Sequence, residues 1–268
     1  IMLEAQQRDS IKQKDIEQVV LIGYGAKKKS DLTGSITALS EKDFNKGAIT
    51  SAEGLLNGRT SGVVVTQSGT PGNDAVIRVR GGSSLLSSND PLIVIDGLPV
   101  EGGLSSINPN DIESFSILKD ASSTAIYGNR GSNGVILITT KKGSKKKLQV
   151  SFNSFTTYNT LAKNVDVYNG DQFREIINTM APDKANLLGT ANTNWQDLIF
   201  RNTASFYSNL SLMGNLFDKI PSRLSIGHTE NEGLLLTSNY KRSTASFTLN
   251  PTLFDNHLKL NISGNYTY

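Results

Sequence analysis

The segment His257–Tyr268, HLKLNISGNYTY, alternates between apolar and polar residues over its whole length. Because successive side chains of a β-strand point to opposite faces, this pattern predicts a strand with one apolar face. A tilted strand of about 9–11 residues is long enough to cross a membrane, and aromatic residues near one end are typical of a membrane interface. The apolar face carries Leu258, Leu260, Ile262, Gly264, Tyr266 and Tyr268.

Four upstream segments show the same alternation and predict further strands, with a turn at Pro251–Asn256 before the last one. Between the first and second strands, Asp171–Met180 has the apolar spacing of a short helix. The four segments are LQVSFN (148–153), Asn209–Met213, RLSIGH (223–228) and STASFTLN (243–250).

Two interpretations of these strands are open: a soluble β-sandwich with one wet face, and a membrane sheet. The polar face is rich in Asn, Ser and Thr and the apolar face ends in Tyr, which favours the membrane. About five strands cannot close a barrel, since the smallest bacterial membrane barrels have about eight, and an open edge is not viable in lipid. The membrane interpretation therefore predicts that the chain is a fragment of a longer protein.

The chain before Lys147 has short elements punctuated by glycine, and the lysines and Gly143 near its end are typical of a linker. It predicts a small α+β domain of roughly a hundred residues. The predicted elements are a helix after the capping box Thr50–Glu53, strands Gly62–Thr66 and Val76–Arg80, a hairpin of Leu92–Ile95 and Leu98–Val100 around Asp96-Gly97, a helix from Asp120 to Ile126 closed by Gly128, and a strand Val135–Thr140.

The composition excludes several classes of protein. The 268 residues include no cysteine, so disulfides, zinc–thiolate sites and cysteine nucleophiles are ruled out. The net charge of +3 is too small for a nucleic-acid-binding polycation. No apolar run reaches the roughly 18 residues of a membrane helix, which leaves only strands to span a membrane.

The segment VVLIGYGAKKKS, Val19–Ser30, looks at first like a phosphate-binding loop. Gly23 and Gly25 match a dinucleotide fingerprint, but Lys28 stands where the third glycine belongs. His228 and His257 lie at strand ends, where a structural role is the simpler explanation. The sequence contains no catalytic constellation, so we expect a protein that is not an enzyme and has no cofactor or metal site.

Three arginines are harder to assign. Arg78 and Arg80 are two residues apart, so they share one face of their strand, and Arg130 lies in the glycine-rich turn YGNRGSNG. A solvated face explains them, and so does a charged face that packs inside a polar wall.

The order and spacing of several motifs together resemble the SusC/RagA family of TonB-dependent outer-membrane transporters. The resemblance covers nearly the whole chain. The segments that carry it are EQVVLIGYG (Glu17–Gly25), GRTSGVVVTQSGTPG (Gly58–Gly72), IRVRGGSS (Ile77–Ser84), PLIVIDGLPV (Pro91–Val100), LKDASSTAIYGNRGSNGVILITTKKG (Leu118–Gly143) and NTNWQDLIFRNTASFYSNLSLMG (Asn192–Gly214).

The resemblance implies an α+β plug domain inside a transmembrane antiparallel β-barrel of about 22 strands in full, of which only the first are present here. Residues 1–14 would be the tail of a preceding small β-sandwich domain, and residues 15–24 the TonB-box region. Residues 25–147 would form the plug, and residues 148–268 the first, truncated part of the barrel.

The resemblance also implies a function: TonB-dependent, energy-coupled import of nutrients, oligosaccharides or peptides, across the bacterial outer membrane. The implied partners are TonB with its ExbB-ExbD energy supply, a SusD-like surface lipoprotein lid, the substrate and outer-membrane lipid, but no nucleic acid. The plug N-terminus would face the periplasm. The alternative is a soluble carbohydrate-binding or adhesive β-protein without transport.

Two sets of site residues follow from the resemblance. An extended β-branched segment can add as a strand to the sheet edge of a partner. TonB would bind Asp15–Leu21 in this way. Arg78, Arg80 and Arg130 would contact polar or acidic groups of the barrel wall. The TonB-binding residues are Asp15, Ile16, Glu17, Gln18, Val19, Val20 and Leu21.

Overall fold

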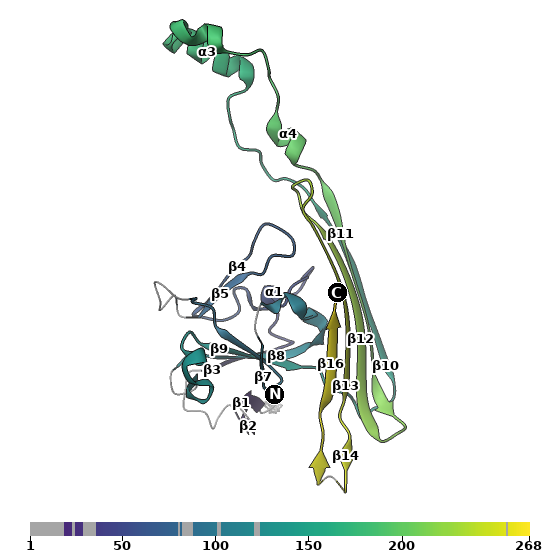
Figure 1. Cartoon of the computed structure of the whole chain (residues 1–268). Helices are drawn as coiled ribbons and strands as arrows, with labels where there is room; N and C mark the ends of the chain where they lie inside the picture. Colours follow the sequence, from purple (N-terminus) through teal and green to yellow (C-terminus); the bar gives the residue numbers. More distant parts are fainter. Residues whose placement is uncertain are drawn as a thin grey trace, which may run out of the picture.

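The computed structural model describes residues 19–22, 25–28, 36–79, 81, 88–100, 103–120, 124–255 and 257–268. Residues 36–140, here called the N-terminal domain, lie beside a tall curved antiparallel sheet, here called the C-terminal sheet (Figure 1). None of the described helices is long and apolar enough to cross a membrane.

The N-terminal domain is built on a five-stranded sheet with the order β3-β8-β9-β6-β7. Its neighbours are antiparallel except for β6 and β9, which are parallel. The strands are β3 (Ile36–Ser40), β6 (Leu92–Ile95), β7 (Leu98–Val100), β8 (Ile112–Leu118) and β9 (Val135–Thr140).

Shorter elements lie within this domain and before it, and the domain has the predicted α+β class. Two separate hairpins pair β1 with β2 and β4 with β5. The elements are β1 (Val19–Ile22), β2 (Gly25–Lys28), α1 (Ala52–Leu56), β4 (Val63–Thr66), β5 (Val76–Val79) and the 3₁₀ helices η2 (Leu104–Ser106), η3 (Pro109–Asp111) and η4 (Ala125–Gly131).

An apolar core lies between the sheet and α1. Phe115 is completely buried and meets the ring of Phe44 edge-on, with the ring centroids 5.4 Å apart. The rest of the core comes from aliphatic side chains of the strands and α1, among them Leu56, Ile117, Ile136 and Ile138. Burial of this kind is the main force that folds a domain of this size.

The predicted hairpin at Asp96-Gly97 is confirmed. Asp96 and Gly97 have φ values of 48° and 91°, the left-handed pair that a tight type I′ turn requires. The Asp96 carboxylate also accepts hydrogen bonds from the backbone N–H and the hydroxyl of Thr140, at 2.9 and 2.5 Å. The turn is therefore fastened to the end of β9.

Two helix boundaries differ from the sequence expectation. The N-cap of α1 is Ser51, whose hydroxyl accepts from the Gly54 N–H, and not Thr50. The carbonyl of Thr50 instead accepts a hydrogen bond from Arg242, which keeps Thr50 outside the helix. Residues 121–123 lie outside the described residues, and Gly128 interrupts η4 with φ 59° and ψ −146° instead of closing a helix.

The C-terminal sheet has five antiparallel strands in the order β10-β11-β12-β13-β16, which confirms the predicted number in the described part of the chain. Most of them are longer than the alternating segments suggested. The strands are β10 (Gln149–Asn159), β11 (Thr203–Leu216), β12 (Ile220–Glu232), β13 (Asn239–Leu249) and β16 (Ile262–Thr267).

The predicted single strand His257–Tyr268 is wrong in one respect, because it is divided. A small hairpin of β14 (Thr252–Leu253) and β15 (Leu258–Lys259) precedes β16, and the segment predicted as a simple turn, Pro251–Asn256, contains β14. The division is held by the Leu260 N–H, which donates to the Pro251 carbonyl at 3.0 Å.

The two ends of the C-terminal sheet are different (Figure 1). At the long-loop end, the β10–β11 connection carries α3 (Gly170–Met180), η5 (Pro182–Leu187) and α4 (Trp195–Ile199). Asn169 and Gln172 form a capping box at α3, which confirms the predicted helix there. At the opposite short-turn end lie the β11–β12 turn and the β14–β15 hairpin.

The two faces of the sheet are chemically opposite. The face toward the N-terminal domain buries Thr203, Ser205, Tyr207 and Asn209 of β11, and Ser225 and Thr229 of β12. The other face exposes apolar side chains, including Phe152, Phe206, Leu210, Ile226 and Phe247. An apolar outer face around a polar interior is the pattern of a membrane β-barrel and the inverse of a soluble β-sandwich.

Candidate functional site

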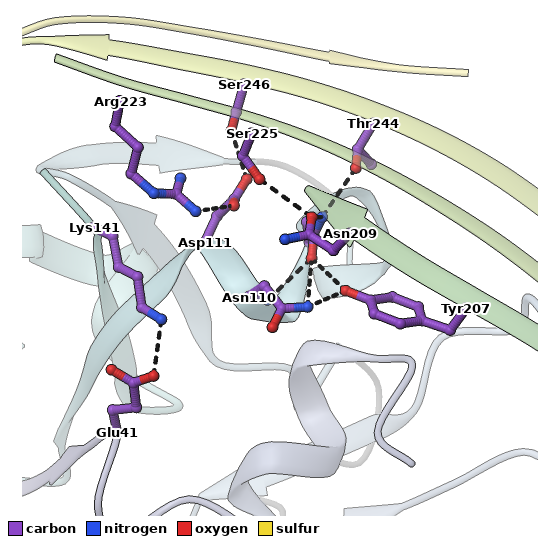
Figure 2. A network of polar contacts seen from close by, with 11 residues as sticks. Glu41, Asn110, Asp111, Lys141, Tyr207, Asn209, Arg223, Ser225, Thr244 and Ser246 are labelled. Atoms are coloured by element: carbon purple, nitrogen blue, oxygen red, sulfur yellow. Dashed lines mark hydrogen bonds and ion pairs between the residues drawn. The ribbon is translucent and has the colours of Figure 1, made fainter. Parts of the chain in front are cut away.

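The candidate site is the polar interface between the N-terminal domain and the C-terminal sheet. Residues 105–111, around η2 and η3, meet the inner faces of β11, β12 and β13 (Figure 2). The contacts join residues more than 90 positions apart in sequence and consist largely of hydrogen bonds.

A buried ion pair lies at the centre of this interface. Arg223 of β12 donates from Nη2 to Asp111 Oδ1 at 2.7 Å, and the two side chains are only 4% and 9% exposed. The second oxygen of Asp111 accepts from the Ser246 hydroxyl of β13 at 2.6 Å (Figure 2). Both carboxylate oxygens of Asp111 are therefore satisfied by the sheet, which makes the pair tolerable away from water.

Asn108 is the centre of a second group of contacts. Its amide nitrogen donates to Asn209 Oδ1 at 2.8 Å and to the Thr244 hydroxyl at 3.2 Å. The Tyr207 hydroxyl donates to Asn108 Oδ1 at 3.0 Å. Gly227 lies beneath this amide, since a Cβ there would come within 2.4 Å of the Asn108 nitrogen. Only glycine lets Asn108 approach β12 this closely.

Arg242 of β13 holds two separate segments of the N-terminal domain. Its guanidinium donates to the carbonyl of Thr50 at 3.0 Å, and also to the carbonyls of Ser105 and Ile107. It lies 5.9 Å from the centroid of the Tyr240 ring. One arginine of the sheet thus connects both η2 and the residue just before α1 to β13.

A cleft of about 580 Å³ opens beside Arg242, between the β4–β5 loop and the upper ends of β10, β12 and β13. Within it, Gly72 packs under the Tyr240 ring, because a Cβ at Gly72 would come within 2.5 Å of Cδ2. The lining is mainly polar and includes Gln67, Asn73, Asp74, Asn159, Asn231 and Glu232.

Glu53 of α1 is a buried carboxyl at the floor of this cleft, only 1% exposed. Burial raises its pKa above the ordinary value, and the negative charge of Asp74 raises it further. Hydrogen bonds from its own backbone, from Ser51 and from the Leu104 backbone act in the opposite direction. The carboxyl therefore binds a proton more readily than an exposed glutamate.

Only some of the site residues predicted from sequence are among the described residues. Of the predicted TonB-binding segment, Asp15–Gln18 lies outside the described residues, and Val19–Leu21 belongs to β1, paired with β2. Arg78 is exposed on β5 and Arg130 is exposed in η4, while Arg80 is not among the described residues. The predicted contacts of these three arginines with a polar wall therefore stay a prediction.

The sequence interpretation missed Asp111, Arg223 and Arg242, the residues that connect the two parts. A signal was available: Arg223 is the charged residue at a polar-face position of RLSIGH, and Arg242 is at a polar-face position directly before STASFTLN, in the same strand. A charge on the buried face of a strand needs a partner. Nothing in the local sequence identified that partner as Asp111, because the pairing spans 112 residues.

The interface holds the domain and the sheet together by hydrogen bonds and an ion pair. The part of the chain that the structure describes contains no group of three or more His, Cys, Asp or Glu that could hold a metal ion. The interface joins a folded domain to a curved sheet by polar contacts.

Comparison with known proteins agrees with this architecture. Residues 28–135 match the family model described as the TonB-dependent receptor plug domain. The chain is 48% identical to the TonB-dependent receptor SusC of Bacteroides thetaiotaomicron, over 94% of this chain and 26% of the relative. It is 38% identical to the TonB-dependent receptor P26 of Formosa agariphila, over 94% of this chain and 27% of that relative.

A solved structure of the RagAB peptide importer in its open-open state also matches. The TM-score is 0.72 with 26% identity, over 93% of this chain and 32% of that chain. This chain spans about a quarter of the length of the curated relatives it matches.

Proposed function

This chain belongs to the SusC/RagA family of TonB-dependent transporters of the bacterial outer membrane, and on that premise we propose that it takes part in energy-coupled nutrient import. The N-terminal domain corresponds to the plug, and the C-terminal sheet to the first strands of the barrel. In this proposal the plug closes the barrel until it is remodelled, and the protein has no enzymatic activity.

The observation that carries the proposal is the polar interface. Asp111 accepts hydrogen bonds from β12 and β13, and Asn108 both donates to and accepts from β11. The carbonyls of Ser105 and Ile107 accept from Arg242 of β13. Hydrogen bonds that are broken in the presence of water are replaced by bonds to water, so their net cost is small. A domain held in this way can separate from the wall without exposing an apolar core, as a movable plug must.

The cleft beside Arg242 supports a role in substrate contact. It lies toward the long-loop end, which is the extracellular end if short turns face the periplasm, as in other bacterial barrels. Its lining of amide, hydroxyl and carboxyl groups suits the hydrogen-bonding groups of an oligosaccharide or a peptide. The RagAB structure is titled a peptide importer, and the cleft itself is compatible with both substrate classes.

We further propose that TonB grips Asp15–Leu21 and that a SusD-like lipoprotein covers the extracellular mouth. Val19–Ile22 already has strand geometry in β1, and a strand can transfer its backbone hydrogen bonds to the sheet edge of a partner. Residues 1–14 then belong to a preceding domain, residues 15–24 to the TonB-box region, residues 25–147 to the plug and residues 148–268 to the barrel. The 147/148 boundary is supported by its place between β9 and β10.

We also propose that Arg78, Arg80 and Arg130 contact polar or acidic groups of the remaining barrel wall. Charge reversal at all three positions should reduce uptake. Unchanged uptake by the triple variant would refute this role.

The proposed import is tested with Val20→Pro in the transporter with its full barrel. Proline removes the backbone donor of a strand, so energised uptake of oligosaccharides or peptides should fall to the background level. Val20→Thr keeps the donor and should retain uptake. Substrate binding to the purified protein should be equal in both variants. Full uptake by V20P, or by a variant that lacks Asp15–Leu21, would refute the TonB-driven mechanism.

A further inference from the structure

Two turns at the short-turn end repeat the residues Leu-Phe-Asp. Leu216–Asp218 leads from β11 into β12, and Leu253–Asp255 leads from β14 toward β15. In both, Phe and Asp have left-handed φ values, 53° and 57° in the first turn and 51° and 50° in the second. Glycine and asparagine are the usual residues in this conformation, and a bulky residue there is strained.

Turn geometry therefore does not explain why phenylalanine is present. Phe217 and Phe254 are 80% and 75% exposed, so packing within the described chain does not explain it either. The apolar outer face of the sheet continues down to these turns, with Leu216, Leu258 and Ile262 exposed. Both phenylalanines thus form the lower border of the surface that faces the acyl chains of the membrane.

A group of lysines lies beside this border. Ser144 forms a β-bridge with Ser222, and Leu148 lies against Gly214, which places the segment between them at the level of the β11–β12 turn. The basic rim, as we call it, consists of Lys145, Lys146 and Lys147 in that segment, Lys219 after the first turn and Lys259 after the second.

The positive charge of the basic rim is not neutralised by the described residues around it. All five lysines are exposed, and none forms an ion pair with any residue that the structure describes. The acidic groups of the two turns are Asp218 and Asp255. Five lysines against two aspartates leave a surplus of three positive charges at the edge of an apolar surface.

We propose that the basic rim binds the anionic phosphodiester headgroups of glycerophospholipids in the membrane leaflet at the short-turn end. Phe217 and Phe254 lie at the boundary between headgroups and acyl chains, and the lysine ammonium groups contact the phosphates. The proposal depends on the outer-membrane location and not on import, so a variant that cannot transport still tests it.

The arrangement favours a lipid over a soluble anion. Lysine is a flexible point charge that suits a laterally mobile layer of phosphates, whereas a built site for one anion has fixed donors. The adjoining apolar border supplies the acyl contact that a soluble phosphate lacks. Each lysine near a charged membrane surface changes binding by about fivefold.

The test uses the transporter with its full barrel, extracted from membranes that contain phosphatidylglycerol and phosphatidylethanolamine. Mass spectrometry of the retained lipid gives the enrichment of phosphatidylglycerol. The variant K146Q/K147Q should lose this enrichment by about 25-fold, because each of the two lysines contributes about fivefold. The matched control K163Q/K184Q removes the same charge from the long-loop end and should keep it, and heat-modified mobility on gels verifies the fold of each barrel.

Added inorganic phosphate should not displace the retained lipid, whereas concentrated salt should reduce the enrichment. The proposal is overturned if the wild type retains both lipids in proportion to the membrane. It is also overturned if K146Q/K147Q retains as much phosphatidylglycerol as the wild type, if both variants lose it equally, or if inorganic phosphate displaces it.

Discussion

The N-terminal domain and the C-terminal sheet bury opposite kinds of side chain. The domain encloses aliphatic and aromatic residues, among them Phe115, Leu104 and Ile138, at 0–1% exposure. On the face of the sheet that the domain covers, the buried residues are mostly serine, threonine, asparagine and arginine. The domain is therefore folded by its own apolar core. The buried polar face of β11, β12 and β13, here called the polar seat, holds the domain in position.

This difference explains how one part can move while the other stays in place. Separating the domain from the sheet exposes polar groups, which water can satisfy. Unfolding the domain exposes an apolar core, which water disfavours. Detachment from the wall should therefore cost less free energy per unit area than unfolding, and the polar seat fixes position more than it fixes the fold.

The largest effect is expected from Phe115→Ala. Removing a fully buried ring that packs edge-on against Phe44 should lower the free energy of unfolding of the domain by about 4 kcal/mol. Hydrogen exchange in the full barrel should show faster exchange in β8 and β9 while β11 and β12 stay protected. As a control, Phe152→Ala on the outer face should leave exchange in the domain unchanged. Equal loss of protection in domain and sheet would contradict the comparison.

Sequence alone predicted the elements on each side of this comparison but not the contacts between them. Alternation identified all five strands of the C-terminal sheet, and Asp96-Gly97 identified a hairpin, because these signals are local. The division before β16 was missed, since it depends on a backbone hydrogen bond from Leu260 to Pro251. Local alternation does not reveal where a strand register is interrupted.

The residues of the polar seat could not be predicted from the sequence, for a related reason. Sequence reasoning singled out Arg78, Arg80 and Arg130, which stand in conspicuous motifs. The described interface instead uses Arg223 and Arg242 of the sheet against Asp111 and backbone carbonyls of the domain. Every residue has a backbone carbonyl, so residue identity does not predict which carbonyls accept hydrogen bonds. An ion pair between distant segments can be recognised only when the topology of the chain is known.

The second effect concerns Arg223. Replacing it with glutamine leaves Asp111 buried without its counter-charge, which should cost about 3 kcal/mol in the attachment of the domain to the sheet. The estimate is at the low end because the Ser246 hydroxyl still donates to Asp111. Protease sensitivity of the segment around η3, in the full barrel, measures the detachment.

Asp111→Asn combined with Arg223→Gln provides the control for this prediction. With no buried charge left, the double variant should recover a large part of the lost attachment, since removing both partners costs less than removing one. If the two single changes simply add, the ion pair is not what fastens the domain.

A smaller effect is expected from Tyr207→Phe. The change removes the hydroxyl that donates to Asn108 and contacts Asn110, but keeps the ring stacked on Phe155 at 4.7 Å. Attachment should weaken by about 1 kcal/mol, the usual net value of one hydrogen bond. Exchange of the η3 amides should rise slightly while that of β8 stays constant. Tyr158→Phe, at an exposed position, should change neither.

The smallest effect is a change in pH dependence at Glu53. Because burial raises its pKa above the ordinary 4.5, the folded domain binds this proton more tightly than the unfolded chain does. The stabilisation is fully present below the unfolded pKa and is lost as the pH rises through the folded pKa. Glu53→Gln, which is neutral throughout, should therefore unfold with a flatter pH profile as the pH rises above the ordinary pKa of 4.5.

Denaturant unfolding at a series of pH values, compared with the wild type and with Glu113→Gln at an exposed position, measures this difference. The Glu113 variant should keep the wild-type profile. A Glu53 variant with the wild-type slope would show that the carboxyl is as well solvated as one at the surface. The surroundings of Glu53 would then be hydrated like the polar interface, and not dry like the apolar core of the domain. In that case α1 would not mark the boundary between the apolar core and the polar interface.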